Sequence, residues 1–508
     1  MASSILAELE RDMAPECAAA FVALATDYFA ATRDASGPVS TPHSPAALGA
    51  RFAEPLPRGG QPAARVVERL ARDVLGDCNR LYHPMYVGHQ VSAPLPAAVW
   101  TESLTAALNQ SLAVFKMSPV GTVIETQLVR WMCELAGYGP GAGGTLTSGG
   151  TEATFTALLA ARSRALPDAW ERGVSVAADC PPVVVCGEHT HYAVTRAVGE
   201  LGLGMRSVVT VASRDYRMDV TALAARLDEA RLVGRTVMAV VATAGSTATG
   251  SFDDLEAIGR LCEERGVWLH VDGAHGASAL LSTPHRPRLR GIERARSVAW
   301  DPHKMMLLPL SAGMLLVRDE RELEGAFAQR APYLFHARAD REDEEAARVW
   351  DQGVRSFQCS RRADVLKVWV ALQRYGADGI GALYDHLCAT TRSLYDAIAA
   401  RPDFVALHEP ECNILCFRYV GDQSRGDAEL DALNRELRER YNRSGAGWIT
   451  ATNLDGRRVL RVTVMNPRTT TTHLDRLLDG LAATAAELLG GRGSAQEQRP
   501  KRAADERG

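Results

Sequence analysis

Four short apolar segments separated by helical patterns run through the middle of this sequence. Residues 182–186, 207–211, 237–243 and 267–271 are rich in Val and other apolar residues, as in strands buried on both faces. A helical pattern follows the third segment, over residues 254–265. Strands that alternate with helices predict an α/β domain with a mainly parallel sheet. Because such sheets bind ligands at the carboxyl ends of their strands, we expect the chemistry directly after these segments.

The patterns divide the chain into four parts. Residues 1–82 are predicted to form a helical arm, 83–375 a large domain and 376–490 a smaller α/β domain. Residues 491–508 are charged and poor in apolar residues, which predicts a disordered tail. Within the last two folded parts we expect strands at 413–419 and 458–465, a helix at 472–489, and a helix at 363–375 whose continuation after Gly376 stays open.

Composition excludes several classes of protein. The formal charge of -4 and the pI near 6.4 give no reason to expect a nucleic-acid partner. The apolar runs are shorter than the ~20 residues that span a bilayer, so no membrane association is expected. Ten scattered cysteines imply no disulfide framework, and residues 1–11 lack the apolar stretch of a secretory signal. We therefore expect a cytoplasmic protein.

Lysine is scarce, since the 57 basic residues include only Lys116, Lys304, Lys367 and Lys501. Arginine cannot provide a nucleophilic amine, whereas lysine can. Three of the four fit ordinary surface lysines, and for Lys367 the reason is its place in an amphipathic helix. Lys304 differs because it follows a short predicted strand and lies among Met, Leu and Pro. Desolvation there favours a nucleophilic amine, although a surface lysine is the alternative.

A second motif is the glycine pair Gly149-Gly150, which opens a predicted helix at 151–165. A helix N-terminus offers free N–H groups and a positive dipole end to an anion such as phosphate, and glycines let the backbone come close. The alternative is an ordinary helix start with a glycine turn. The lysine of a nucleotide-binding P-loop is absent, which argues against that type of site.

Asp272 and His191 each follow an apolar segment. A carboxylate at a strand end needs a partner, which a cationic ring nitrogen or a metal ion provides. A metal site would use His270, Asp272 and His275, but His275 lies beyond the turn, and we expect no metal. A histidine of the segment after residues 182–186, His189 or His191, is placed to stack on a planar cofactor, with a structural or surface histidine as the alternative.

In chain order the sequence thus provides an anion-binding helix start, a strand-end His, a strand-end Asp and a loop Lys. These are the groups that pyridoxal 5'-phosphate needs: a phosphate cradle, a ring stack, a carboxylate for the pyridinium nitrogen and a Schiff-base amine. The combination is far more specific than any of its members alone.

With these residues in place, the chain resembles the group II pyridoxal-phosphate-dependent amino-acid decarboxylases, among them glutamate, cysteine sulfinate, diaminobutyrate and aromatic amino-acid decarboxylases. The resemblance covers residues 83–489 and includes the spacing between Asp272 and Lys304. It extends to His83-Pro84-Met85-Tyr86, Ser118-Pro119 with Glu125, residues 356–362, and Arg461 with Asn466-Pro467. It implies fold type I, the aspartate aminotransferase-like fold, and a homodimer with active sites at the interface.

The resemblance also implies roles for single residues around the cofactor. Lys304 would form the Schiff base, Asp272 would pair with the pyridinium nitrogen and His191 would stack on the ring. Thr247 matches a threonine near the cofactor. The implied reaction is decarboxylation of an L-amino acid to an amine and carbon dioxide, in which the protein's main contribution is to orient the scissile bond.

The remaining implied roles concern the phosphate and the substrate. Gly150, Thr151 and His303 would hold the phosphate. Arg461 would bind the substrate α-carboxylate, and His89 lies where glutamate-type members have a substrate-contacting residue. Neither His89 nor the position of His275 indicates which amino acid is the substrate.

The sequence departs from the family in the expected catalytic loop, between Tyr333 and Gln358. Family members often carry a tyrosine there that protonates the carbanion, but residues 334–374 contain none. His336 is a candidate for the acid that protonates the carbanion in place of the tyrosine. The alternative is an ordinary solvated loop histidine. Because relatives without this tyrosine form aldehydes by oxidative deamination, that reaction is an alternative, together with aminotransferase or lyase chemistry and a non-catalytic binding protein.

Overall fold

The computed structural model describes residues 2–177, 179–327 and 350–497. The chain forms two compact units. Unit 1 comprises Met1–His89, Arg392–His408 and Leu415–Gly508, and unit 2 comprises Gln90–Thr391 and Glu409–Ile414. The domain boundaries expected after residues 82, 375 and 490 stay a prediction.

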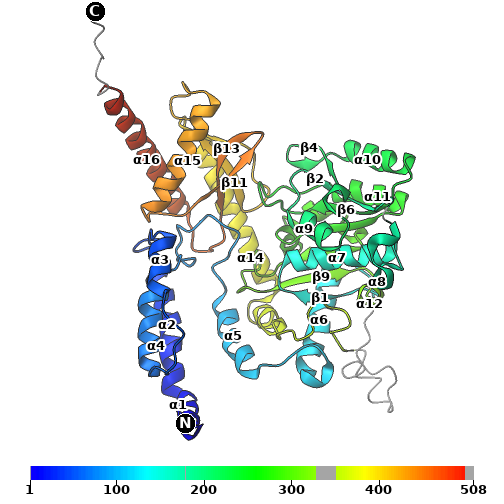
Figure 1. Cartoon of the computed structure of the whole chain (residues 1–508). Coiled ribbons are helices and arrows are strands. Elements are labelled where there is room, and N and C mark those ends of the chain that lie inside the picture. Colours follow the sequence, from blue (N-terminus) through cyan, green and yellow to red (C-terminus); the bar gives the residue numbers. More distant parts are fainter. Residues whose placement is uncertain (1, 178, 328–349, 498–508) are drawn as a thin grey trace, which may run out of the picture. The chain divides into compact units, whose positions relative to one another are not determined.

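Unit 2 is built around a seven-stranded sheet with the order β1-β9-β8-β7-β6-β2-β3 (Figure 1). Five neighbouring strands, β8, β7, β6, β2 and β3, pair in parallel. Strand β9 runs antiparallel to both β8 and β1. The bounds are β1 Gly143–Thr147, β2 Val183–Gly187, β3 Val208–Val211, β6 Val237–Thr243, β7 Trp268–Asp272, β8 Ser297–Trp300 and β9 Gly313–Val317. The expected α/β fold with a mainly parallel sheet is confirmed.

Burial on both faces explains the continuous apolar sequences of these strands. Every residue of β2, β7, β8 and β9 is buried. Helix α7 (Gly150–Ala165) contacts β6, β7, β8 and β9, and α9 (Ala193–Glu200) packs beside it. Ala153 and Ala157 of α7 pack against Ala299 and Leu315, and their small side chains let the helix lie close to the sheet.

Two other helices of unit 2 begin at an aspartate N-cap. Asp219 accepts hydrogen bonds from the first turn of α10 (Val220–Leu232), and Asp254 does so for α11 (Leu255–Arg265). The remaining helices are α5 Pro96–Leu108, α6 Pro119–Leu135, α8 Ala169–Arg172 and α12 Arg321–Ala326. Single 3₁₀ turns occur at Phe115–Met117, Val174–Ala177, Met205–Ser207, Gly276–Leu281, Arg286–Leu289 and Ile292–Arg294, and β4 Ser213–Arg214 pairs with β5 Arg217–Met218.

Helix α14 (Val365–Ala399) confirms the helix expected at 363–375 and extends it. Gly376 interrupts the helix with a positive φ of 72°, a conformation that glycine adopts without strain. The helix then resumes, which answers the question that the sequence left open.

Unit 1 contains a four-stranded sheet and the N-terminal helices. The sheet has the order β10-β11-β13-β12, and α15 packs against β13 and α16. The strands are β10 Phe404–Ala406, β11 Ile414–Tyr419, β12 Thr450–Leu454 and β13 Arg457–Thr463, and the helices are α1 Ala2–Asp12, α2 Pro15–Arg33, α3 Pro45–Phe52, α4 Ala63–Arg69, the π-helical turn Leu70–Leu75, α15 Asp427–Arg443 and α16 Thr471–Glu497. Helix α16 ends at Glu497, and residues 498–508 lie outside the described residues, so the disordered tail expected from residue 491 stays a prediction.

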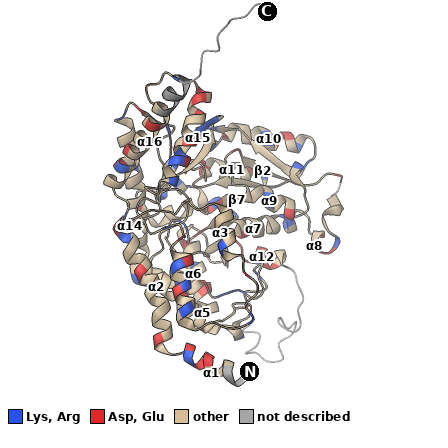
Figure 2. Ribbon diagram, turned by 60° about the vertical axis from the view of Figure 1, so that its left-hand side comes forward, with Lys and Arg blue, Asp and Glu red and all other residues tan. Residues whose placement is uncertain are grey.

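Acidic and basic residues both occur along individual helices such as α6 and α14 (Figure 2). Among the described helices, none is both long and apolar enough to cross a membrane.

Candidate functional site

The carboxyl ends of the parallel strands bring the predicted cofactor residues of unit 2 to one edge of the sheet. Thr243, the last residue of β6, is in register with Asp272, the last residue of β7. Asp272 in turn is in register with Ala299 of β8, two residues before Asp301. Thr190, after β2, lies 3.5 Å from Thr243 between their Oγ1 atoms. Neighbouring strands therefore place the segments that contain His191, Asp272 and Lys304 side by side.

Lys304 lies in a tight turn after β8 whose backbone is fixed from several sides. The N–H of Asp301 donates to the carbonyl of Ala274 (3.1 Å), and the N–H of Lys304 donates to the carbonyl of Asp301 (2.9 Å). The Lys304 amine lies 3.1 Å from Oδ2 of Asp301, and the lysine side chain is 21% exposed. The amine is thus held by a buried carboxylate, while the lysine side chain as a whole stays partly exposed.

The start of α7 forms a cradle beside this turn. A Cβ atom on Gly150 would lie 2.8 Å from the Cβ of Ala274 and 3.1 Å from Oδ2 of Asp301, so the absence of a side chain keeps this space open. A Cβ on Gly149 would lie 3.2 Å from Cε1 of His303. The first N–H groups of α7, those of Gly150 and Thr151 among them, have no acceptor within the helix and suit an anion.

His303 faces this cradle in a defined tautomer. Its Nδ1 accepts a hydrogen bond from the N–H of Ala312 (3.1 Å), so the proton of the neutral ring is on Nε2. Nε2 lies 3.4 Å from Oδ2 of Asp301. Burial lowers the pKa of His303, while Asp301 opposes this shift. His303 therefore presents an N–H donor at neutral pH, as a phosphate oxygen requires.

Asp272 and His191 provide the groups expected for a ring. Asp272 is 8% exposed, and its Oδ1 accepts from the N–H of Ala274 (3.2 Å). Burial lowers the pKa of His191; Asp272 acts against this shift and Lys304 adds to it, which means that the three side chains are near one another. His191 Nδ1 accepts from the N–H of Ala193 (3.2 Å). A neutral, oriented imidazole suits stacking on a planar ring.

Thr247 lies in a turn directly after β6. The turn needs Gly245, whose φ is 81° and whose Cβ would lie 2.9 Å from the backbone nitrogen of Gly276. Hydrogen bonds among Ser246, Thr249 and Ser251 close the turn. The turn after β6 is thereby packed against the segment that follows Asp272.

Unit 1 brings together the two predicted substrate residues, His89 and Arg461. Burial lowers the pKa of His89, and the charges of Arg461 and Arg438 lower it further. Arg461, on β13, is 8% exposed, and burial also lowers its pKa. Thr450 ties the two segments together, since its Oγ1 donates to the carbonyls of Gly88 (3.1 Å) and Arg461 (3.2 Å). A buried guanidinium beside a neutral histidine can bind a carboxylate.

The histidines of the metal alternative have other contacts. Nδ1 of His270 lies 2.9 Å from Oγ of Ser297, and burial lowers the pKa of His270 to about 4. Nε2 of His275 lies 2.7 Å from Oδ1 of Asn413. Within residues 2–177, 179–327 and 350–497, no three His, Cys, Asp or Glu side chains are grouped to hold a metal ion.

Two residues were misjudged from the sequence. Asp301 was overlooked as a partner of Lys304, although its position three residues earlier in a turn was the available signal. The interpretation of Lys367 as a surface lysine is wrong, because its side chain is 1% exposed and pairs with Glu102 (2.5 Å) and Asp364 (3.1 Å). Its amphipathic helix packs that face inward. The expected catalytic loop, with Tyr333 and His336, lies largely outside the described residues.

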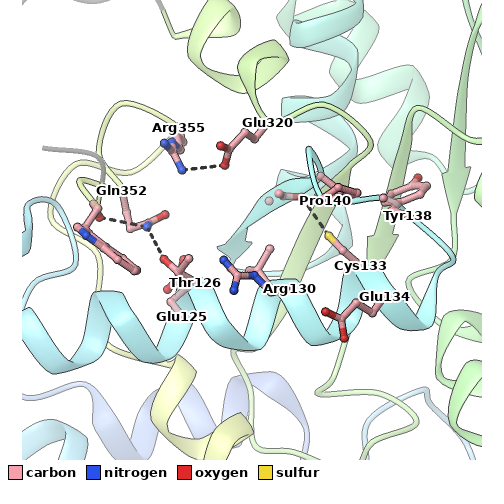
Figure 3. Close-up of a pocket in the computed structure, with 16 residues that line it drawn as sticks. Glu125, Thr126, Arg130, Cys133, Glu134, Tyr138, Pro140, Glu320, Gln352 and Arg355 are labelled. Atoms are coloured by element: carbon pink, nitrogen blue, oxygen red, sulfur yellow. Dashed lines mark hydrogen bonds and ion pairs between the residues drawn. The ribbon is translucent and has the colours of Figure 1, made fainter. Parts of the chain in front are cut away.

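A hollow of about 590 Å³ lies at the other end of β1, lined by Gly143 and Gly144 (Figure 3). Arg355 pairs with Glu320 across it (3.2 Å). Cys133 also lines it, but burial raises the pKa of this thiol to about 12, so it is unreactive at neutral pH. None of the predicted cofactor or substrate residues lines this hollow.

Comparison with known proteins places this site in context. The family model described as "Pyridoxal-dependent decarboxylase conserved domain" matches residues 58–420. L-2,4-diaminobutyrate decarboxylase of Rhizobium meliloti is 35% identical over 436 residues, which cover 86% of this chain and 84% of that protein. Cysteine sulfinic acid decarboxylase of Rattus norvegicus is 32% identical over 445 residues, 84% of this chain and 87% of that protein.

Solved structures confirm the expected fold type I. The crystal structure of mouse CSAD in apo form has a TM-score of 0.84 and 30% identity, and the match covers 92% of this chain and 99% of that one. The Rhodiola rosea 4-hydroxyphenylacetaldehyde synthase shares the fold with a TM-score of 0.82 at 21% identity, over 95% of this chain and 98% of that one.

Proposed function

Since this chain belongs to the pyridoxal-dependent decarboxylase family, we propose that the strand-end site of unit 2 holds the cofactor through Lys304 and that His89 and Arg461 of unit 1 bind the substrate. The protein is a pyridoxal-phosphate-dependent amino-acid decarboxylase, a carboxy-lyase that forms an amine and carbon dioxide. The observation that carries the site assignment is the partly exposed Lys304 side chain beside His191 and Asp272.

Each residue of unit 2 has a defined task in this assignment. The N–H groups of Gly150 and Thr151 and the Nε2–H of His303 bind the phosphate. Asp272 holds a proton on the ring nitrogen, because a buried carboxylate favours a cation beside it. His191, kept neutral by burial, would stack on the ring, and Thr247 would contact the cofactor from the turn after β6. Bound pyridoxal phosphate supplies a ring that takes up the electron pair left when carbon dioxide departs.

The residues of unit 1 orient the substrate. Arg461 binds the α-carboxylate, for which its buried guanidinium is suited. A fixed substrate carboxylate determines the orientation of the scissile bond. This orientation is the protein's main contribution to the rate. His89 lies near Arg461 and contacts the rest of the substrate.

The substrate is proposed to be an L-amino acid with a short, charged side chain. The support is that relatives at 30% identity or more are named for 2,4-diaminobutyrate and for cysteine sulfinic acid, both of which fit this description. The sign of the charge is left to experiment. Release of carbon dioxide from 2,4-diaminobutyrate, cysteine sulfinate, aspartate and glutamate tests the proposal; turnover confined to large aromatic amino acids would contradict it.

Decarboxylation to an amine is favoured over oxidative formation of an aldehyde. The relatives that exceed 30% identity are named as decarboxylases, whereas the aldehyde synthase shares only the fold. Assays for amine, ammonia and peroxide distinguish the two, since peroxide in amounts equal to carbon dioxide would establish the aldehyde route. Borohydride reduction is expected to fix the cofactor on the peptide that contains Lys304.

A homodimer is proposed because helices of both units expose apolar faces. On α5, Trp100, Leu104 and Leu108 are 37%, 55% and 48% exposed and recur at helical spacing. On α1, Ile5 and Leu9 are likewise exposed. A second copy of the chain that covers these faces would remove the apolar surface from water. We also propose a cytoplasmic location, which the absence of disulfide bonds among the cysteines of the described residues supports.

A further inference from the structure

Asp301 combines deep burial with a single well-placed lysine partner. It is 1% exposed, and its Oδ2 lies 3.1 Å from Nζ of Lys304 and 3.4 Å from Nε2 of His303. Its Oδ1 has no hydrogen-bond partner within the part of the chain that the structure describes. A buried carboxylate is costly unless it is paired, so the contact with Lys304 is a strong local constraint on both side chains.

The turn around Lys304 fixes the backbone but leaves four side-chain carbons free to rotate. The backbone is held because the N–H of Leu307 donates to the carbonyl of Lys304 (3.0 Å) and the N–H of Lys304 donates to the carbonyl of Asp301 (2.9 Å). A lysine side chain has many rotamers, and only a contact at its end selects among them. In the described residues, the ion pair with Asp301 is the contact that does so.

Lys367 differs from Lys304 in the number of its carboxylate partners and in its burial. Asp364 and Lys367 are also three residues apart and also 3.1 Å apart, but Glu102 binds the same amine at 2.5 Å. The Lys367 side chain is 1% exposed, whereas that of Lys304 is 21% exposed. One carboxylate therefore fixes the Lys304 amine while leaving the side chain partly exposed beside Gly150.

We propose that Asp301 is a positioning residue that holds the Lys304 amine at the edge of the phosphate cradle whenever the amine is not covalently engaged. The inference rests on the proposed attachment of the cofactor to Lys304. In that attachment the Lys304 ammonium first releases one proton to solvent; the Nζ lone pair then bonds to the aldehyde carbon of pyridoxal phosphate, and the carbonyl oxygen leaves as water with the two remaining amine protons. Asp301 takes no part in these bond changes. It determines the position of the Lys304 amine before the cofactor is attached.

The test follows cofactor attachment rather than turnover. The full-length enzyme is freed of cofactor and mixed with increasing pyridoxal phosphate, and the visible band of the attached cofactor is recorded over time. For Asp301→Asn we expect the limiting first-order rate to fall about tenfold, because the amine loses its orientation. The half-saturating concentration is expected to change less than about twofold, since the phosphate cradle is intact. Asp301→Glu, which keeps the charge, is expected to recover part of the rate.

Asp364→Asn is the matched control, because it removes the equivalent carboxylate from Lys367. Its limiting rate is expected to equal that of the wild type, while thermal melts report any general loss of stability. A wild-type limiting rate in Asp301→Asn, or an equal slowing in Asp364→Asn, would overturn the positioning role. If Asp301→Asn does not fold, Asp301→Ser, which also removes the carboxylate, is measured in its place, and a wild-type limiting rate there together with an unchanged melting temperature overturns the role. Borohydride label outside the Lys304 peptide would instead refute the proposed cofactor attachment.

Discussion

Arg361 and Glu125 form a buried, two-pronged ion pair, with Nη1–Oε2 and Nη2–Oε1 distances of 2.9 and 2.6 Å. Their side chains are 4% and 1% exposed. Oε1 of Glu125 also accepts from the N–H of Leu146 on β1 (3.2 Å). The pair thus ties the segment before α14 to α6 and to the strand that leads into the phosphate cradle.

Arg361→Met is expected to lower the free energy of unfolding by about 3–5 kcal/mol, because it leaves the Glu125 carboxylate buried without its cation. Urea denaturation measures this loss. Arg321→Ala is the control, since Arg321 pairs with Asp319 while 82% exposed and its removal is expected to change the free energy of unfolding far less than Arg361→Met does. Equal losses in the two variants would contradict the structural importance of the buried pair.

Gly150→Ala is expected to weaken cofactor binding by at least about tenfold, because the new Cβ would press on Ala274 and Asp301 at the cradle. Fluorescence titration with pyridoxal phosphate measures the change. Gly139→Ala serves as the matched change, since a Cβ there meets nothing within 4 Å. Wild-type affinity in Gly150→Ala would show that the cradle is elsewhere.

The stability of the fold is expected to fall in acid because of His270. The unfolded histidine takes up a proton near pH 6.5, whereas burial lowers the pKa of folded His270 to about 4. Between these values the unfolded state binds more protons, so the free energy of unfolding decreases as the pH falls, by about 3 kcal/mol in total. In His270→Gln this part of the pH dependence should vanish. Denaturation at several pH values checks it, and an unchanged slope would exclude His270 as its source.

The buried Lys367 is expected to serve stability and not cofactor attachment. Lys367→Met leaves Glu102 and Asp364 without their shared cation and should lower the melting temperature, while borohydride still traps the cofactor on Lys304. Lys304→Ala should abolish trapping, and because it leaves the buried Asp301 without its cation it should also lower the melting temperature. Mass spectrometry of the reduced peptides distinguishes these cases, and label lost in Lys367→Met but retained in Lys304→Ala would reverse the assignment.

Leu104→Glu combined with Leu108→Glu is expected to convert a dimer into monomers, because two charges would be placed on the exposed apolar face of α5. Light scattering with size-exclusion chromatography measures the mass. Glu134→Gln, at an exposed position of α6, is the control substitution. A monomeric wild type, or a double variant that stays dimeric, would remove α5 from the proposed interface.

Long apolar runs made the central strands predictable, but less apolar strands escaped. β1 is Gly143–Thr147, with two glycines, and β12 is Thr450–Leu454, partly exposed and rich in polar residues. Neither stands out by its own composition. Both become strands because a neighbouring strand provides backbone hydrogen-bond partners: β9 pairs with β1, and β13 pairs with β12.

The sequence alone determined the alternation of strands and helices. It also identified Lys304 as the candidate Schiff-base lysine, because the chain contains so few lysines. Local composition carries that information, since apolar runs and residue identity do not depend on distant partners. The tertiary structure decided which carboxylate accompanies the lysine and that Lys367 is sealed inside. Burial and ion pairing are set by residues far apart in the chain, such as Glu102 and Lys367, whose approach no local pattern encodes.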